Sequence, residues 1–466
     1  MTITPRFVNS LFLCLQWVKF RYNKLNIQKV NKLKILLIGN GFDLAHNLPT
    51  NYRNFLEFCR IVKNIYESEP FLKNKIHQKI ASCNLGDYIK QKLSEAVKSR
   101  KLLEKENNDD SNVKYYITSN NALNEFYSIT NNNRWLEYFE RKSSKMRENW
   151  IDFENEIANV VKDIDTVLTK LKNNKFSFDD EELKGNKTIE FLNYSRSHLK
   201  DITDISSLKT FISKLNTDLE KLIRALEIYI AAFVNNINLQ AENEDVKNIN
   251  PDCVLSFNYS NTFERMYDKE KKISYDYIHG KADINKNFKT CNMVLGIDEY
   301  LDDSKKDKDL ELLPFKKFYQ RIYKSTGNRY LNWIDQIKDD YFDYEKKIND
   351  AYASTVQALK DGSFDINPFH KKDCAEALNE KYEEHILYIF GHSLDVTDRD
   401  ILKMFICNEN VQTKIFYYRE DEEDKRVLAQ IIKNLIMIMG QDELIRRTGG
   451  QHKTIEFIPQ APSTTH

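Results

Sequence analysis

Leu33 to Asp43 reads LKILLIGNGFD, an apolar run that ends abruptly in a glycine turn. Residues 33–38 are leucine and isoleucine, interrupted only by Lys34. This composition is typical of a strand that is buried on both faces of a sheet. Glycine at Gly39 and Gly41 lets backbone N–H groups approach a phosphate without interference from a Cβ atom. Because position 44 is leucine, the full G-x-G-x-x-G pattern is absent, and a tight turn without a ligand is an equally good interpretation.

Further strand-like runs come only after residue 250. They are Asp252 to Phe257, Tyr275 to His279, Met293 to Ile297, His385 to Phe390, Lys414 to Tyr418, and Thr454 to Ile458. Helical patterns separate several of them, notably Asp398 to Ile406 and Lys425 to Met439. Strands that alternate with helices pair in parallel, so the sequence predicts an α/β fold with a parallel sheet.

Two charged, glycine-poor stretches interrupt this core. We expect a helical insertion over residues 67–249 and a second one over 305–380, which leaves a discontinuous core of residues 33–66 and 250–460. The clearest helical periodicity lies at Trp135 to Val167 and Leu215 to Ile237. Polar segments, at Asn107 to Asn112 and Asn173 to Lys187, are expected to be loops. Thr50 is expected to cap a helix whose buried face carries Tyr52, Phe55, Leu56, Cys59 and Val62.

Composition limits the class of protein. The 70 Lys+Arg balance 70 Asp+Glu, so no overall field attracts a polyanion and nucleic acid is an unlikely partner. Aromatic residues make up 12% of the chain, which is too many for a disordered protein. The 7 cysteines are scattered and form no C-x-x-C pair, which argues against disulfides and a structural zinc site. We therefore expect a protein of a reducing, cytoplasmic compartment that needs no metal.

The first 30 residues contain no motif that could form a site. The apolar segment Phe7 to Val18 is too short to span a membrane, for which about 20 residues are needed. Only Arg6 precedes it as a basic residue, and no A-x-A-like cleavage site follows. We interpret residues 1–30 as a leader or a mis-assigned upstream start, in preference to a targeting signal, and expect no membrane partner.

Polar residues follow three of the predicted core strands directly. Asn258 lies in SFNYSNTFE, His279 in IHGK, and Ser393 in FGHSL. Since the carboxyl ends of parallel strands lie at one edge of a sheet, these residues should converge with the Gly39 turn on a common site. A side-chain amide, a histidine that titrates near neutrality and a Gly-x-Ser turn are all suited to binding a nucleotide.

Each of these motifs also has a purely structural interpretation. Asn258 could cap the helix that begins near Thr262, and Asp398 could cap the helix after FGHSL. A single histidine such as His279 is more often structural than catalytic. The G-x-S sequence is not a hydrolase nucleophile elbow, because Asp395 stands where the elbow needs glycine. Asp298 and Glu299 are slightly better explained as turn residues than as site carboxylates.

The motifs together resemble a known family. LLIGNGFDLAHNLPTNYRNFLEF, NWIDFENEI, SFNYSNTFE, IHGK, VLGIDE and FGHSLDVTDRDIL are similar to blocks of the AbiH family of bacterial abortive-infection proteins. The order of glycine turn, F-N-Y, H-G and G-H-S-L also resembles, more distantly, that of sirtuin-type NAD-binding domains. The resemblance implies a sirtuin-like nucleotide-binding core with large helical insertions.

The resemblance also implies roles for individual residues. Asn258 and His279 would be catalytic, with Asn258 at the nicotinamide end. Binding of the dinucleotide would fall to a wider set: Gly39, Asn40, Gly41 and Asp43 in the first turn, with Gly391 and Ser393 on the adenosine side. Sirtuin deacylases have aspartate where this chain has Ser260, and they carry a four-cysteine zinc module that it lacks. Peptide deacylation is therefore not expected, and simple cleavage of NAD fits better.

We expect an anti-phage protein that hydrolyses NAD as its substrate, without metal. The alternatives are a nucleotide-sensing module that controls a partner effector and, less favoured, a metal-dependent nuclease toxin, for which carboxylates are few. NAD or a related nucleotide is the expected ligand. A phage-derived trigger is implied but not identified, and a homo-oligomer is left open.

Overall fold

The computed structural model describes residues 32–106, 112–145, 152–173, 204–297, 310–360, 384–450 and 453–461. The predicted leader and most of the predicted loop from Asn173 to Lys187 lie outside these residues.

A six-stranded parallel sheet forms the core, as the sequence predicted. Its strands are β1 (Lys34–Ile38), β4 (Cys253–Ser256), β5 (Ser274–Tyr277), β6 (His385–Phe390), β7 (Val411–Tyr417) and β8 (Ile455–Pro459). They lie in the order β5-β4-β1-β6-β7-β8. Numbered along the chain, this order is third, second, first, fourth, fifth, sixth, which is the order of doubly wound dinucleotide-binding sheets. The direction of winding reverses between β1 and β6.

Both faces of β1 are buried, which explains its continuous apolar sequence. Ile35 and Leu37 pack against one set of helices, and Leu36 and Ile38 pack on the opposite face. The first face is covered by α13 (Tyr330–Lys360), α15 (Arg399–Ile406), α16 (Arg426–Met439) and α17 (Gln441–Thr448). The second face is covered by two short helices, α2 (Asn40–Ala45) and α11 (Thr262–Met266).

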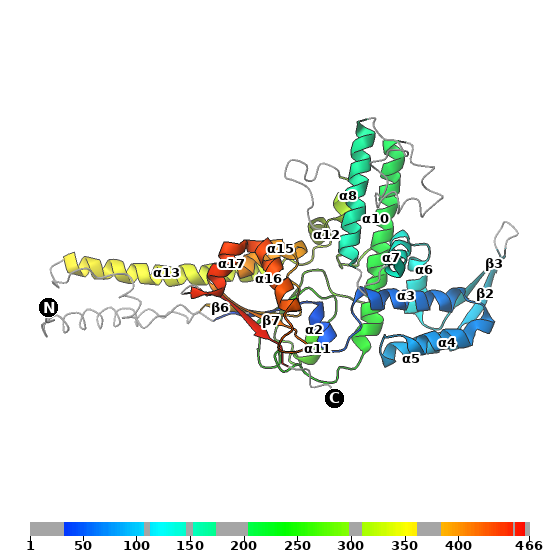
Figure 1. Ribbon diagram of the computed structural model, residues 1–466, viewed down its shortest axis with the longest axis horizontal. Helices are drawn as coiled ribbons and strands as arrows, with labels where there is room; N and C mark the ends of the chain where they lie inside the picture. Colours follow the sequence, from blue (N-terminus) through cyan, green and yellow to red (C-terminus); the bar gives the residue numbers. More distant parts are fainter. Residues whose placement is uncertain are drawn as a thin grey trace.

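A second hydrophobic core lies in the helical region beside the sheet. Its helices are α3 (Tyr52–Glu67), α4 (Lys73–Ser82), α5 (Asp87–Ser99), α6 (Asn121–Thr130), α7 (Arg134–Lys145), α8 (Phe153–Lys172) and α10 (Ile205–Ile228). Short helical turns complete it: η1 (Pro70–Leu72), η4 (Tyr229–Phe233) and η5 (Val234–Asn236). In Figure 1, α8 and α10 run side by side away from the sheet. The helix α3 packs into this second core and not onto the sheet.

Three local expectations were wrong. Asn51, and not Thr50, caps α3, because the Asn51 side chain accepts a hydrogen bond from the Asn54 backbone N–H at 2.8 Å. The segment from Met293 to Ile297 has only an isolated bridge to Lys316, and it is apolar because it is buried in the helical core. An antiparallel hairpin, β2 (Lys101–Glu106) and β3 (Asn112–Ile117), flanks the predicted loop and was not expected.

The remaining elements connect the two cores. The turn η6 (Leu313–Phe315) leads into α12 (Lys317–Tyr323), and η7 (Val396–Asp398) leads into α15. The Gln320 side chain on α12 exchanges two hydrogen bonds with the Leu295 backbone, at 3.1 and 3.0 Å. These bonds satisfy the backbone N–H and C=O of Leu295, which a neighbouring strand would have satisfied if this segment lay in the sheet.

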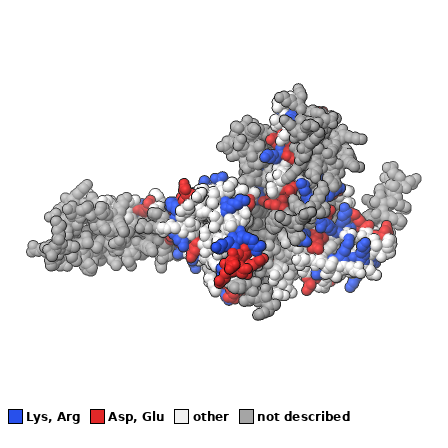
Figure 2. Space-filling view, viewed as in Figure 1, with Lys and Arg blue, Asp and Glu red and all other residues white. Residues whose placement is uncertain are grey.

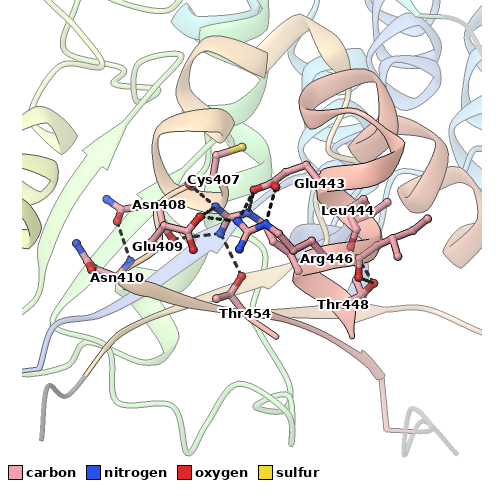
Figure 3. Close-up of polar contacts among 11 residues, drawn as sticks. Cys407, Asn408, Glu409, Asn410, Glu443, Leu444, Arg446, Thr448 and Thr454 are labelled. Carbon is pink, nitrogen blue, oxygen red and sulfur yellow. Dashed lines mark hydrogen bonds and ion pairs between the residues drawn. The ribbon is translucent and has the colours of Figure 1, made fainter. Parts of the chain in front are cut away.

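At the amino end of β7, a buried arginine joins α17 to the sheet, and Figure 3 shows its partners Cys407, Glu409, Glu443 and Thr454. Arg447 is 1% exposed and donates to the Cys407 carbonyl at 2.7 Å and the Thr454 hydroxyl at 3.1 Å. Its Nε also donates to Glu443 at 2.6 Å, and the Nη2 that contacts Cys407 also donates to Glu409 at 2.7 Å. This arginine therefore fixes the turn between α15 and β7, at the edge of the sheet opposite the carboxyl ends of the strands.

Candidate functional site

Two glycine turns meet where the winding of the sheet reverses. After β1, the Gly39 N–H donates to the Phe390 carbonyl at 3.1 Å, and the Gly41 N–H donates to the Gly391 carbonyl at 2.7 Å. Gly391 has a φ of 68°, and a Cβ atom on it would lie 2.2 Å from the Phe42 nitrogen. The contact between the turns alone therefore requires glycine at this position. The binding of a phosphate by the first turn remains a prediction.

Asn258 lies beside the first turn and does not cap a helix. Its side-chain amide donates to the Gly39 carbonyl at 2.9 Å, while Asn261 occupies the N-cap position of α11. The side chain is 5% exposed. The carboxyl end of β4 is thus tied to the carboxyl end of β1, which is the convergence that the sequence predicted. Asn40 lies in the same turn and accepts a hydrogen bond from the Thr50 hydroxyl at 2.6 Å.

Asp43 is a buried carboxylate under the same turn. The Ser260 hydroxyl donates to its Oδ2 at 2.6 Å, whereas Oδ1 has no hydrogen-bond partner among the described residues. Burial raises the pKa of Asp43 to about 6, although the hydrogen bond from Ser260 and the nearby polar side chains of Thr262 and Asn258 oppose this shift. A buried acceptor without a partner is costly to retain in a protein core. Asp43 is thus able to accept a hydrogen bond from a ligand hydroxyl.

His279 follows β5 and faces Asp398. Its Nε2 lies 3.4 Å from Asp398 Oδ1, and its Nδ1 has no hydrogen-bond partner in the described part of the chain. The residue is 6% exposed. Burial and the positive charge of Lys317 lower the pKa of His279 to about 4, so the imidazole is neutral at pH 7.

His392 lies on the other side of the same carboxylate. Its Nδ1 accepts a hydrogen bond from the Leu394 N–H at 2.9 Å, which places the proton on Nε2. Nε2 points to Asp398 Oδ2 at 3.6 Å. The Phe257 ring packs edge-on against His392 at 4.4 Å and against His279 at 5.5 Å. Two histidines from different strand ends therefore bracket one carboxylate.

Asp398 is the centre of this cluster, although the sequence suggested only that it caps a helix or, with Asp395, is one of the few carboxylates that a nuclease could use. It occupies the N-cap position of α15, but its side chain makes no capping hydrogen bond. Burial alone would raise the pKa of Asp398, but the Lys317 ammonium and the two imidazoles hold it well below its ordinary value. The carboxylate is therefore ionised at neutral pH.

Two charged side chains from the helical regions complete the cluster. Lys317 Nζ lies 3.2 Å from Asp398 Oδ1 and 2.8 Å from Glu154 Oε2. Burial raises the pKa of Glu154 to about 7, against the opposing charge of Lys317. Sequence reasoning missed both residues as site residues. Glu154 lies in the NWIDFENEI block, which indicated the family but did not indicate a role for this residue. Lys317 lies in no motif.

The other candidates from the sequence are peripheral or undescribed. Ser393 is exposed, and its carbonyl accepts a hydrogen bond from the Asn434 side chain at 2.8 Å. Asp395 caps η7 by accepting from the Thr397 N–H at 3.0 Å. Asp298 and Glu299 lie outside the described residues. Within the described ranges, no three His, Cys, Asp or Glu side chains are grouped so that they could hold a metal ion.

The cluster is largely closed to solvent, and the surface of the molecule carries charges of both signs. The side chains of His279, His392 and Lys317 are between 5% and 8% exposed. A hollow of about 370 Å³ lies elsewhere, between α5, α6 and η4, and is lined by residues that include Tyr88, Asn120 and Phe233. Figure 2 shows acidic and basic side chains next to one another on the face in view, without a continuous basic surface.

Comparison with known proteins gives one match. A family model described as "Bacteriophage abortive infection AbiH" matches residues 35–418, which include β1 from its second residue, β2 to β7 and both helical regions. No curated protein and no solved structure matches the chain. Among the described helices, none has the length and apolar character that a membrane crossing requires.

Proposed function

The chain belongs to the AbiH family of bacteriophage abortive-infection proteins, a family of anti-phage defence, and from this premise we propose that it acts by hydrolysing NAD to nicotinamide and ADP-ribose. The proposal is carried by one observation. A cluster of two histidines and an ionised aspartate lies at the reversal point of a sheet with the 3-2-1-4-5-6 strand order. Sheets of this order bind dinucleotides in the crevice outside the reversal point.

The chemistry of NAD cleavage matches the groups in this cluster. The bond between the nicotinamide nitrogen and ribose C1′ breaks, and its electron pair leaves with nicotinamide as a neutral molecule. The ribosyl carbon passes through a cation-like state, takes up water, and the water loses one proton. We assign Asn258 to the nicotinamide end and His279 to proton acceptance from water or a ribose hydroxyl. A fixed anion such as Asp398 favours positive charge that develops nearby.

Asp43 and the two glycine turns would bind the rest of the dinucleotide. Asp43 has an unpartnered, buried carboxylate oxygen that can accept from a ribose hydroxyl. Gly39, Asn40 and Gly41 would approach the pyrophosphate, and Gly391 and Ser393 the second ribose. No metal enters this scheme.

A nucleotide-sensing module is the second candidate. It is favoured by the closed state of the cluster, because the side chains of His279 and Lys317 are no more than 8% exposed. In this case the same residues would bind a nucleotide and transmit its presence to a partner effector through the helical regions.

The test is to incubate the purified full-length chain with NAD, without added metal, and to measure free nicotinamide and ADP-ribose by chromatography. Equal amounts of both products, lost in Asp398→Asn and retained in the control His77→Ala on α4, would support hydrolysis. If NAD binds by calorimetry but yields no nicotinamide, even with extract of phage-infected cells, the binding module is correct. If NAD neither binds nor reacts under these conditions, hydrolysis of NAD is wrong; if ATP, GTP and ADP-ribose also fail to bind by calorimetry, the nucleotide-sensing module is wrong too.

A further inference from the structure

Lys317 is a lysine buried among carboxylates at the centre of the molecule. Its side chain is 5% exposed, and the ammonium lies 3.2 Å from Asp398 Oδ1 and 2.8 Å from Glu154 Oε2. A buried ammonium is retained at acceptable cost only when it is paired and hydrogen-bonded. Asp398 belongs to the sheet core and Glu154 to α8, so this one side chain joins the candidate site to the helical core.

We infer that Lys317 is a positioning residue, which holds Asp398 ionised between the two histidines and makes this arrangement depend on the docking of α8. A positioning role for Lys317 presupposes the function proposed above, whereas the contacts of Lys317 with Asp398 and Glu154 do not depend on that function. Without Lys317, the Asp398 carboxylate would be buried between the two imidazoles, and no other lysine or arginine of the described residues forms an ion pair with it.

The charges around His279 support this role. Asp398 faces it at 3.4 Å, Lys317 and Arg321 contribute positive charge, and the rings of Phe257 and Tyr259 lie 5.5 and 6.3 Å away. His392 shares the same carboxylate from the other side. Lys317 lowers the pKa of His279 and of Asp398, so its removal favours a proton moving onto this pair.

Glu154 is held firmly by its own helix, which is why the docking of α8 matters. It is the second residue of α8, whose first turn is capped by the Asp152 carboxylate accepting from the Asn155 N–H. The neighbouring Phe153 stacks between Tyr52 and Phe139, with ring centroids 4.1 and 4.0 Å apart. A shift of α8 would therefore carry Glu154 away from Lys317.

The first experiment follows the titration of the imidazoles in the full chain by NMR with labelled histidine, and it needs no nucleotide. Lys317→Met removes the charge at nearly constant length, and we expect the His279 midpoint to rise by about one pH unit or more. Lys317→Arg should keep the midpoint near that of the wild type. The matched control is Lys324→Met, because Lys324 at the end of α12 is also buried and pairs with Glu220 at 2.9 Å, outside the site. An unchanged His279 midpoint in folded Lys317→Met would overturn the inference.

The second experiment keeps Lys317 and releases the helix. In Glu154→Gln, amide hydrogens in the first turns of α8 should exchange at least about 10-fold faster than in the wild type, because a buried ion pair has been removed. Unchanged exchange would contradict the coupling, and this variant remains informative if Lys317→Met fails to fold.

If the wild type cleaves NAD, Lys317→Met should lower kcat by about 10-fold or more with little change in KM, and Lys317→Arg should restore part of it. Unchanged kcat would overturn the inference and leave the proposed function intact, whereas absence of cleavage in the wild type would leave the NMR test in force.

Discussion

At the scale of single residues, the buried Asp43 carboxylate lowers the free energy of unfolding when it is ionised, and a substitution can measure this loss. Its folded pKa of about 6 exceeds the ordinary value of 3.8, so ionisation of the native state is disfavoured. The resulting loss of stability grows as pH rises through this window, and is complete above about pH 6 and absent below about pH 4. Asp43→Asn should therefore raise the free energy of unfolding at pH 7 by about 1–3 kcal/mol, with no gain at pH 4.

Urea unfolding at pH 4 and pH 7 measures this difference. Asp395→Asn is the control, since Asp395 caps η7 and is only partly buried. If Asp43 serves the proposed site, the stabilised variant should also bind NAD more weakly. A variant that is no more stable at pH 7 than the wild type would show that the burial cost of Asp43 is offset by contacts other than those described.

The two histidines that bracket Asp398 should differ in function. His279 has an unpartnered Nδ1 and a pKa of about 4, whereas the Nδ1 of His392 is occupied by the Leu394 N–H. We expect His279→Ala to lower kcat for NAD cleavage by at least about 10²-fold, the usual scale for a lost general acid or base. His392→Ala should act mainly on KM, because it loosens the Gly391 turn.

Steady-state kinetics on both variants, with folding checked by circular dichroism, decides between these roles. Near wild-type kcat in a folded His279→Ala enzyme would remove His279 from the catalytic step.

The sequence predicted the strand-end part of this site but not its charged centre. Asn258, His279 and the glycine turns each follow a strand directly, and parallel pairing guarantees that such residues converge. Lys317 and Glu154 reach the site from helices whose position depends on tertiary packing, so no local pattern marks them. Asp398 carried a local signal that fitted a helix cap equally well.

At the scale of elements, Arg447 joins α17 and β8 to the turn before β7. The side chain is 1% exposed and satisfies two backbone carbonyls, the Thr454 hydroxyl and two carboxylates. Arg447→Met removes the donor to the two backbone carbonyls and the Thr454 hydroxyl, while Arg446 still pairs with both carboxylates, and should cost about 3 kcal/mol. The neighbouring Arg446 pairs with the same Glu443 and Glu409 but is 37% exposed, so Arg446→Met should cost much less than Arg447→Met.

Urea midpoints of both variants test this difference. Because Arg447 lies at the sheet edge opposite the candidate site, neither change should alter the affinity for NAD. Equal losses of stability in the two variants would mean that the difference in exposure between Arg446 and Arg447 does not determine how much each contributes to stability.

Elements buried on both faces were predicted well because their sequences are apolar throughout. Six of the seven predicted strands lie in the sheet, within a few residues of their expected bounds. The seventh, Met293 to Ile297, is equally apolar but is buried by helices, and burial alone does not distinguish the two cases. The hairpin of β2 and β3 was missed because charged residues dominate β2 and mask the alternation of a strand.

At the scale of the whole molecule, the helical core is not a removable module. Its buried cluster includes residues from the chain segment after β5, among them Met293, Leu295, Ile297 and Phe315. Each such apolar side chain gains about 1.5–3 kcal/mol from burial. Replacing residues 67–249 by a short linker would expose them together with the inner face of α3. We therefore expect this deletion to give insoluble protein or a chain without a cooperative thermal transition.

The control deletion shortens the projecting hairpin instead (Figure 1). Leu102 pairs with Tyr116 across β2 and β3, so joining them by Asn-Gly gives a minimal hairpin. The Arg100 guanidinium still stacks on the Tyr116 ring at 3.8 Å. This variant should remain soluble, with Tm within about 3 °C of the wild type, since surface loops tolerate such changes. A soluble, cooperatively unfolding chain without residues 67–249 would show that the sheet folds alone. In that case the ion pair of Glu154 and Lys317 would connect two domains that fold independently, and the two cores would not form one folding unit.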